Sequence, residues 1–148
     1  MSYAPRPASS AQIRRLVVEF DRLAGEGDPR ACGPKREPYE RTREDRLAWA
    51  SAHIGVQLHS FNELTGPQAG YLLDILNGKA TALDRGLADD WKRLRVNDPA
   101  AYFATMCSRG PQHFGQLFWR FKGLDLSQLS MKAKWELRRI LARRQPAA

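Results

Sequence analysis

The sequence predicts an all-α chain of about six or seven helices, in two small sequential bundles that pack together. Three observations predict this fold class. Apolar residues recur at helical spacing, residues that cap helices stand before these segments, and glycines follow them. The chain has 148 residues, of which 43% are hydrophobic, so it can bury one ordinary core or two small abutting ones.

Two helical modules are predicted along the chain. An N-terminal helical module covers residues 10–78 and follows a flexible N-terminus at residues 1–9. It contains an insert rich in proline, glycine and arginine at residues 25–41, where three prolines, three glycines and no periodicity predict a loop. A basic C-terminal helical module covers residues 79–144, and residues 145–148 form a tail.

The first two helices flank this insert. Apolar residues at helical spacing predict a helix at about 11–24, with a serine before it as the cap and Gly25 as the stop. The second helix follows the insert, at a point where Thr42 and Asp45 resemble a capping pair. We expect it to end at Gly55.

The third helix has the clearest boundaries. Thr65 stands at the N-cap, and Gln68 completes a capping box with it. Pro67 falls in the first turn, where its missing N–H costs nothing. Gly78 follows the last apolar residue as a C-terminal stop. The helix is too apolar to be exposed, so we expect it to pack on the first two.

Further helices are predicted in the second module. The segment ATALDRGLADDWKRLRV favours a helix less strongly, because Gly86 interrupts it. Asp98 and Pro99 open another helix, which Gly110 closes. The next helix ends at Gly123 and carries a core-facing stripe. The residues of this stripe are Phe114, Leu117, Phe118 and Phe121.

The last predicted helix resembles the third when the two are aligned without gaps at an offset of 65. The matching residues are Leu64, Thr65, Leu72, Ile75 and Leu76 in the first copy and Leu129, Ser130, Leu137, Ile140 and Leu141 in the second. Two explanations stay open, an internal duplication and a pattern common to capped amphipathic helices. The copies also differ, because Pro67, Asp74 and Gly78 are replaced by Lys132, Arg139 and Arg143.

This last helix carries the candidate binding site. The segment Arg120–Arg144 has eight basic residues and two acidic ones. On a helical wheel, Lys132, Arg139 and Arg143 form a strip well away from the apolar side, with Trp135 near its edge. Basic side chains beside an aromatic ring suit a phosphate backbone with a base that can stack. The candidate contact residues are Arg120, Lys122, Lys132, Lys134, Trp135, Arg138, Arg139 and Arg143.

Other interpretations of this surface stay open. The strip is also typical of a solvated face, with Trp135 packed on a neighbouring helix, or of a protein interface. A second basic group is interleaved with acidic residues, so ion pairing and solubility explain it better than phosphate binding. Its members are Lys35, Arg36, Arg41, Arg43 and Arg46.

Composition narrows the class of partner and the compartment. The formal net charge of +8 and the pI near 10 favour a polyanionic partner, of which nucleic acid is the commonest. No apolar run approaches the roughly 20 residues of a membrane span, and the first residues lack the apolar part of a signal peptide. We therefore expect a cytoplasmic protein without a membrane partner. Cys32 and Cys107 stand in unrelated contexts, which predicts a pair of reduced thiols.

Part of the first module is similar to a known group of proteins. The segments SAQIRRL, RLAWASAHIG and SFNELTGPQAGYLLDILNGK cover roughly residues 10–78. They resemble a small helical module at the ends of phage-type recombination and single-strand-annealing proteins, and are distantly similar to GemA-like phage regulatory proteins. The chain departs from that pattern by its long insert. The resemblance implies a role in the DNA metabolism of mobile elements, and it supplies no catalytic residue.

Residues that could carry catalysis or bind a metal are few. His53 and His59 have no cysteine or carboxylate at ligand spacing, and His113 is typical of a capping or surface histidine. Asp89 and Asp90 are explained by the preference of a helix N-terminus for negative charge. The chain also lacks a Gly-rich phosphate loop and the H-E-x-x-H and G-x-S-x-G motifs. We therefore predict no enzyme, no cofactor and no metal site.

The function predicted from these observations is a non-enzymatic nucleic-acid-binding accessory protein, which contacts the phosphate backbone through its C-terminal module. Backbone contacts do not tell DNA from RNA or single strands from duplexes, so these choices stay open. One alternative is a helical small subunit of a larger nucleoprotein complex, such as an RNA-guided effector. The other is a protein-interaction adaptor, in which the basic face serves solubility.

Overall fold

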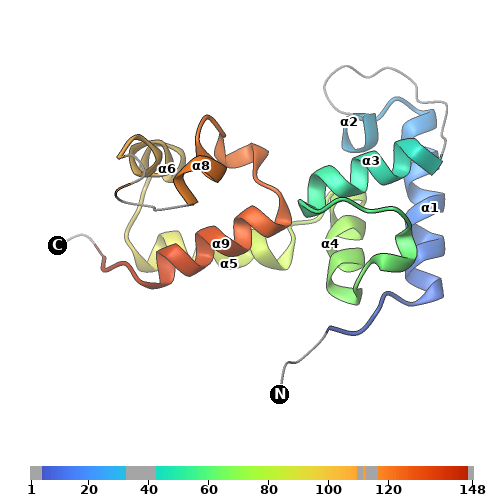
Figure 1. The fold of residues 1–148 in the computed structure, drawn as a ribbon, viewed down its shortest axis with the longest axis horizontal. Coiled ribbons are helices and arrows are strands. Elements are labelled where there is room, and N and C mark those ends of the chain that lie inside the picture. The colour runs from blue at the N-terminus through green and yellow to red at the C-terminus, as the bar shows by residue number, and fades with distance from the viewer. Residues whose placement is uncertain (1–4, 33–42, 110–111, 113–116, 147–148) are drawn as a thin grey trace. The chain divides into compact units, whose positions relative to one another are not determined.

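The chain folds into helices throughout the part that the structure describes. A computed structural model describes residues 5–32, 43–109, 112 and 117–146. Within these residues we find eight α-helices, two short 3-10 helices and no strand (Figure 1). The predicted all-α fold class is therefore confirmed. None of the helices in these ranges has the length and apolarity of a membrane span.

Two compact units make up the chain. Unit 1 is Met1–Thr81 and unit 2 is Ala82–Ala148. The sequence places the boundary between its two modules after residue 78, and the observed boundary follows Thr81. Each unit has its own buried core.

Unit 1 is built around the pairing of its first and last helices. Its elements are α1 (Ser10–Gly25), α2 (Pro29–Cys32), α3 (Arg43–Ile54), the 3-10 helix η1 (Phe61–Glu63) and α4 (Gly66–Leu76). α1 packs mainly against α4, and α2 and α3 also contact α4. The ring centroids of Phe20 and Trp49 lie 5.2 Å apart, so α1 and α3 meet through aromatic side chains. Other core residues include Leu16, Leu23, Leu72 and Leu76.

The helix starts of unit 1 follow the capping chemistry of the sequence. The Thr65 hydroxyl accepts a hydrogen bond from the Gln68 N–H at 3.2 Å, and the Gln68 side chain accepts one from the Thr65 N–H at 2.9 Å. Ser9 and Gln12 form the same reciprocal pair at the start of α1. Both pairs satisfy N–H groups that have no partner inside the helix. The expected cap at Thr42 lies outside the described residues.

The chain before α1 is paired with the start of α4. The sequence predicts a flexible N-terminus over residues 1–9, but two backbone hydrogen bonds hold its later part. The Ala8 N–H donates to the Leu64 carbonyl at 2.9 Å, and the Gly66 N–H donates to the Arg6 carbonyl at 2.7 Å. The side-chain caps do not use these backbone groups. The bonds join segments that are distant in sequence, so local sequence patterns do not predict them.

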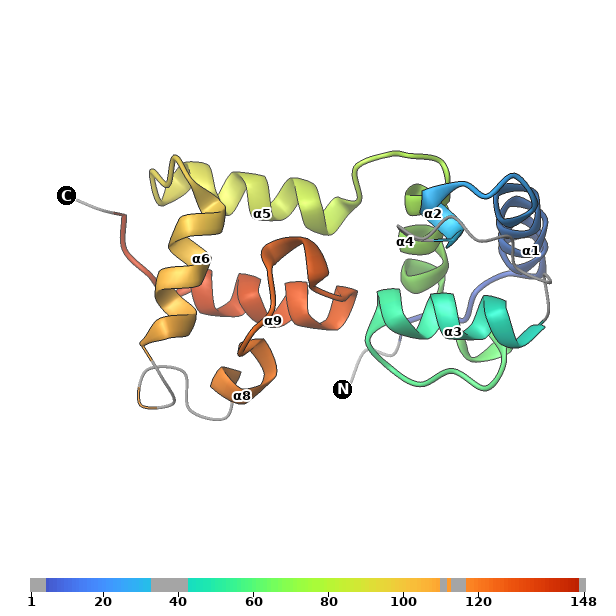
Figure 2. The ribbon, with the colours of Figure 1, turned by 90° about the horizontal axis from the view of Figure 1, so that it is seen from above.

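Unit 2 pairs its first helix with its closing helix. Its elements are α5 (Ala82–Arg93), α6 (Pro99–Ser108), α8 (Leu117–Phe121), the 3-10 helix η2 (Leu126–Gln128) and α9 (Met131–Ala142). α5 and α9 lie side by side (Figure 2). The Asp98 carboxylate caps α6 as predicted, because it accepts a hydrogen bond from the Ala101 N–H at 3.1 Å. The core includes Leu87, Trp91, Leu94, Phe103, Met106, Phe121, Leu129, Leu137 and Leu141.

α1 ends at Gly25, one residue after its predicted end, and Gly27 adopts the left-handed conformation, with φ of 70°, that follows the helix end. The prediction that Gly86 interrupts a helix is wrong. α5 is continuous through Gly86, because its apolar face packs on α9 and outweighs the weak helix propensity of glycine. Gly55 and Gly123 follow their helices as predicted, with φ of 90° and 77°. The expected stop at Gly110 lies outside the described residues, as does most of the segment before α8.

The offset of 65 found in the sequence is matched by local structure. η1 and η2 occupy corresponding positions and are each followed by one buried leucine in extended conformation, Leu64 and Leu129. The next residues, Thr65 and Ser130, are N-caps whose hydroxyls accept from the backbone N–H three residues on, both at 3.2 Å. The two closing helices therefore begin with the same chain geometry.

Both closing helices also end on an arginine from elsewhere in their unit. The Arg30 guanidinium donates to the Leu76 carbonyl at 3.0 Å, and the Arg93 guanidinium donates to the Leu141 carbonyl at 2.6 Å. These two carbonyls correspond at the offset of 65. Asp28 holds Arg30 in place, and its hydrogen bonds with Arg30 lower the pKa of the Asp28 carboxyl to about 2.

We expect the cap of α4 to contribute measurably to stability. Replacing Thr65 by Ala leaves the Gln68 N–H without its acceptor and should lower the free energy of unfolding by roughly 0.5–2 kcal/mol. Lys132→Ala is the control, because this side chain is exposed and should change stability by no more than about 0.5 kcal/mol. Comparable losses in chemical denaturation would contradict the described cap.

Candidate nucleic-acid interface

The excess positive charge of the chain is concentrated in unit 2. Residues 82–148 contain 13 Lys and Arg against six Asp and Glu, whereas residues 1–81 contain 11 against ten. The formal net charge is therefore +7 for unit 2 and +1 for unit 1. A polyanion that selects between the units by charge alone would bind unit 2.

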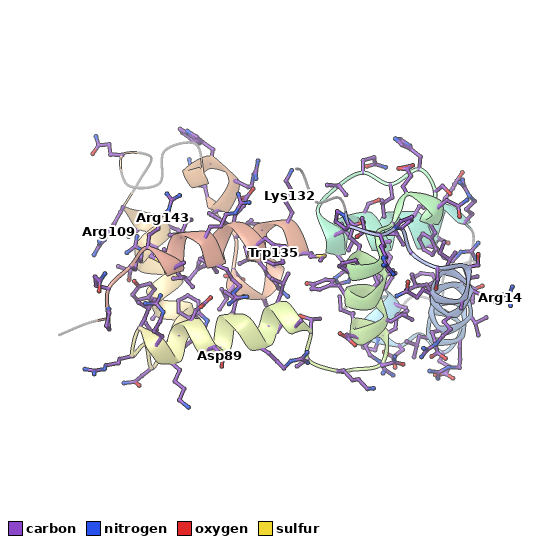
Figure 3. All side chains as sticks on the ribbon, turned by 90° about the horizontal axis from the view of Figure 1, so that it is seen from below. Arg14, Asp89, Arg109, Lys132, Trp135 and Arg143 are labelled. Carbon is purple, nitrogen blue, oxygen red and sulfur yellow. The ribbon has the colours of Figure 1, made fainter. Side chains whose placement is uncertain are left out.

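Four of the candidate residues form one exposed strip on α9. We call them the outer strip: Lys132, Trp135, Arg139 and Arg143. Lys132, Trp135 and Arg143 are labelled along α9, from its start to its end, in Figure 3. The core residues of α9 are on the opposite side of the helix. Within the described residues, the three basic side chains of the outer strip have no ion pair.

Two other candidates on α9 face α5 instead of solvent. The Lys134 ammonium lies 2.8 Å from the Asp84 carboxylate, and the Arg138 Nε lies 2.9 Å from the Asp90 carboxylate. The hydrogen bond to Asp90 raises the pKa of Arg138. Lys134 and Arg138 are one helical turn apart, so the two ion pairs run along the seam between α5 and α9. Their charges are largely offset by the acids of α5.

The side chain of Arg138 crosses α5 at Gly86. A Cβ atom on Gly86 would lie 2.4 Å from Nη1 and 2.5 Å from Cζ of Arg138. These distances are too short for a non-bonded contact, so a side chain at position 86 would force the guanidinium to shift. Asp90, the acid that binds Arg138, is one turn further along the same face of α5. Gly86 lowers the helix propensity of its segment, but it leaves space for the ion pair between α5 and α9.

The remaining two candidates lie on or next to α8. Arg120 forms an ion pair with Glu136, which ties α8 to α9. The Lys122 ammonium lies 5.1 Å from the centroid of the Trp119 ring, within cation–π range. Trp119 is exposed and was not among the candidates. The sequence indicated that Trp119 is exposed, because Trp119 stands outside the apolar stripe that ends at Phe121.

The second basic group does not form a comparable surface in the described residues. Arg46 pairs with Asp21 at 3.2 Å, and Arg43 donates to the His59 carbonyl at 2.6 Å. The contact of Arg46 agrees with the ion-pairing interpretation, and Arg43 is instead bound to a backbone carbonyl. The other three members, at positions 35, 36 and 41, lie outside the described residues.

Several residues considered for catalysis or metal binding have contacts that serve the fold instead. His53 packs against Trp49, with ring centroids 5.2 Å apart. Burial raises the pKa of the Cys107 thiol, so this cysteine is a weaker nucleophile than an exposed one. Asp89 and Asp90 lie in the second half of α5, so the prediction that they mark a helix N-terminus is wrong. Asp90 binds Arg138, and Asp89 is exposed. Among the described residues, no group of three or more His, Cys, Asp or Glu is arranged to hold a metal ion.

Comparison of the chain with protein-family models, with curated proteins and with solved structures gives no match. The similarity of residues 10–78 to phage recombination and GemA-like modules therefore stays a prediction.

The role of Gly86 is testable with a matched pair of glycines. A Cβ atom added to Gly70 would meet no atom within 4 Å beyond its chain neighbours and the nearby backbone of α4, so Gly70→Ala should raise the free energy of unfolding by roughly 0.5–1 kcal/mol. Gly86→Ala should lack this gain, because the new methyl group displaces Arg138 from Asp90. In an Arg138→Ala background, Gly86→Ala should stabilise like Gly70→Ala. Equal gains from both single substitutions in urea denaturation would argue against the described crossing.

Proposed function

We propose that the protein is a non-enzymatic accessory protein that binds nucleic acid through the phosphate backbone, using the outer strip of α9. One observation supports this above the others. The two closing helices begin with the same geometry, but only α9 carries exposed cations. At the offset of 65, the outer strip corresponds in α4 to Pro67, Gly70, Asp74 and Gly78. A difference of charge on similar scaffolds favours a ligand for the charged copy.

The dimensions of the outer strip suit a nucleic-acid backbone. From Lys132 to Arg143 the helix rises by about 16 Å at 1.5 Å per residue. That length equals about five phosphates along one strand of a duplex, at 3.4 Å each. Cations on this line would replace condensed counterions, and the release of these ions drives binding. The surface therefore favours affinity for the backbone without selection of base sequence.

The candidate residues have different parts in this proposal. Lys132, Arg139 and Arg143 contact phosphates, and Lys122 adds positive charge next to α8. Arg120 holds α8 to α9 through its ion pair with Glu136. Lys134 and Arg138 are the remaining candidates on α9, and we propose that they position it. Because they already bind carboxylates of α5, a phosphate would have to displace a partner that is fixed in place.

Purification without nuclease distinguishes this proposal from the two alternatives. The 260/280 nm absorbance ratio reports bound nucleic acid, and mass spectrometry identifies proteins that co-elute. Nucleic acid without other proteins supports the proposal. Nucleic acid together with stoichiometric proteins supports a subunit of a nucleoprotein complex. Proteins without nucleic acid support an interaction adaptor.

Charge reversal on the outer strip should remove binding. We expect Arg139→Glu combined with Arg143→Glu to abolish or strongly weaken association with an oligonucleotide, measured by fluorescence anisotropy, while circular dichroism stays helical. The affinity of the parent protein should fall steeply with salt. Each single Arg→Ala change should lower the log–log salt slope by about 0.7–0.9, because one fewer phosphate is neutralised.

The matched control makes the same change of charge in unit 1. Arg14 and Arg15 are exposed on α1, and Arg14 is labelled in Figure 3. Arg14→Glu combined with Arg15→Glu alters the net charge equally but should leave affinity close to that of the parent. If both double variants lose binding to the same extent, net charge and not the outer strip governs association.

A further inference from the structure

The exposed tryptophans point to the kind of strand. We infer that unit 2 binds single-stranded nucleic acid, with unpaired bases stacked on Trp135 and Trp119 beside the cations of α8 and α9. This inference rests on the proposed function, and it adds Trp119 to the binding surface and selects single strands over duplexes.

The four tryptophans of the chain fall into two groups. Trp49 and Trp91 are 8% and 6% exposed, and each belongs to the core of its unit. Trp119 and Trp135 are 65% and 51% exposed, and both belong to unit 2. An indole is the largest apolar side chain, and leaving it in water forgoes the stabilisation that burial would give. Two such exposures in the more basic unit indicate a ligand with flat apolar faces.

Each exposed indole lies beside positive charge. Trp135 is part of the outer strip, three residues from Lys132 and four from Arg139, so these side chains share one face of α9. The Lys122 ammonium lies over the Trp119 ring. A base that stacks on either indole would therefore have its phosphate near a cation, which is the arrangement of single-strand-binding surfaces.

An ion pair connects the two helices that carry these indoles. Arg120 follows Trp119 and binds Glu136, which follows Trp135. The contact couples α8 to α9 at the residues next to both rings. The contact keeps together the two helices that carry the rings, and the inference places both rings along one strand.

Unpaired bases explain the indoles better than a duplex does. In a duplex the base faces are covered by neighbouring pairs, so an indole gains a stacking partner only by unstacking them. A single strand exposes these faces without that cost. Stacking is also tolerant of sequence, in agreement with a surface that otherwise offers backbone contacts.

The test compares single tryptophan variants on two ligands, a thymidine oligonucleotide of about 16 nucleotides and a duplex of equal length. Trp135→Ala and Trp119→Ala should each weaken single-strand affinity by about 5- to 150-fold, with little change in salt slope, because stacking releases no counterion. Trp→Phe at the same sites should retain most of the affinity. The duplex should bind more weakly than the single strand, and equally in all variants.

Intrinsic fluorescence provides a second measurement on the folded protein. The oligonucleotide should quench the emission of the parent, and the quenching should disappear in the Trp119→Phe/Trp135→Phe double variant, whose remaining indoles are buried. Quenching that persists in this variant would overturn the inference.

The outcomes separate this inference from the proposed function. If single strand and duplex bind equally, both Trp→Ala variants behave like the parent, and Arg139→Glu/Arg143→Glu abolishes binding, the inference fails and the proposed function stands. If the parent binds neither ligand, both fail. Binding of a co-purified protein that needs Trp119 and Trp135, without binding of either oligonucleotide, assigns the indoles to a protein interface and overturns both.

Discussion

Each unit depends on the pairing of its first helix with its closing helix. α1 meets α4 and α5 meets α9, and all four helices contribute residues to the core of their unit. The last carbonyls of a helix have no partner within it. Arg30 and Arg93 satisfy carbonyls of Leu76 and Leu141 from outside the closing helix. The Arg30 bond ties α2 to the end of α4, and the Arg93 bond ties the end of α5 to the end of α9.

In unit 2 the same pairing decides which cations remain for a ligand. Lys134 and Arg138 bind acids on α5, while Lys132, Arg139 and Arg143 stay exposed on the other side of α9. A count of basic residues does not distinguish these five. In the fold, two of them pair with acids and three are exposed. The proposed binding surface is thus narrower than the composition of the segment indicates, and it is a rigid line because the paired cations hold the helix that carries it.

The sequence predicted what is local and missed what is distant. The caps at Thr65 and Asp98 were predictable, because donor and acceptor are three residues apart. The exposed strip followed from helical spacing alone. Gly86 was misinterpreted as a helix interruption, since Arg138, the residue that needs its missing side chain, is remote in sequence. Trp119 was missed, although its position outside the apolar stripe of its segment indicated that it is exposed.

The ion pairs between α5 and α9 also influence which helices pair with each other during folding. α4 and α9 begin with the same geometry. The face of α1 that binds α4 is therefore a competing packing surface for α9. Two acids of α1, Glu19 and Asp21, are already bound to arginines of unit 1, so Lys134 and Arg138 would lose their partners there. Charge matching thus disfavours the pairing of α9 with α1 in place of α5.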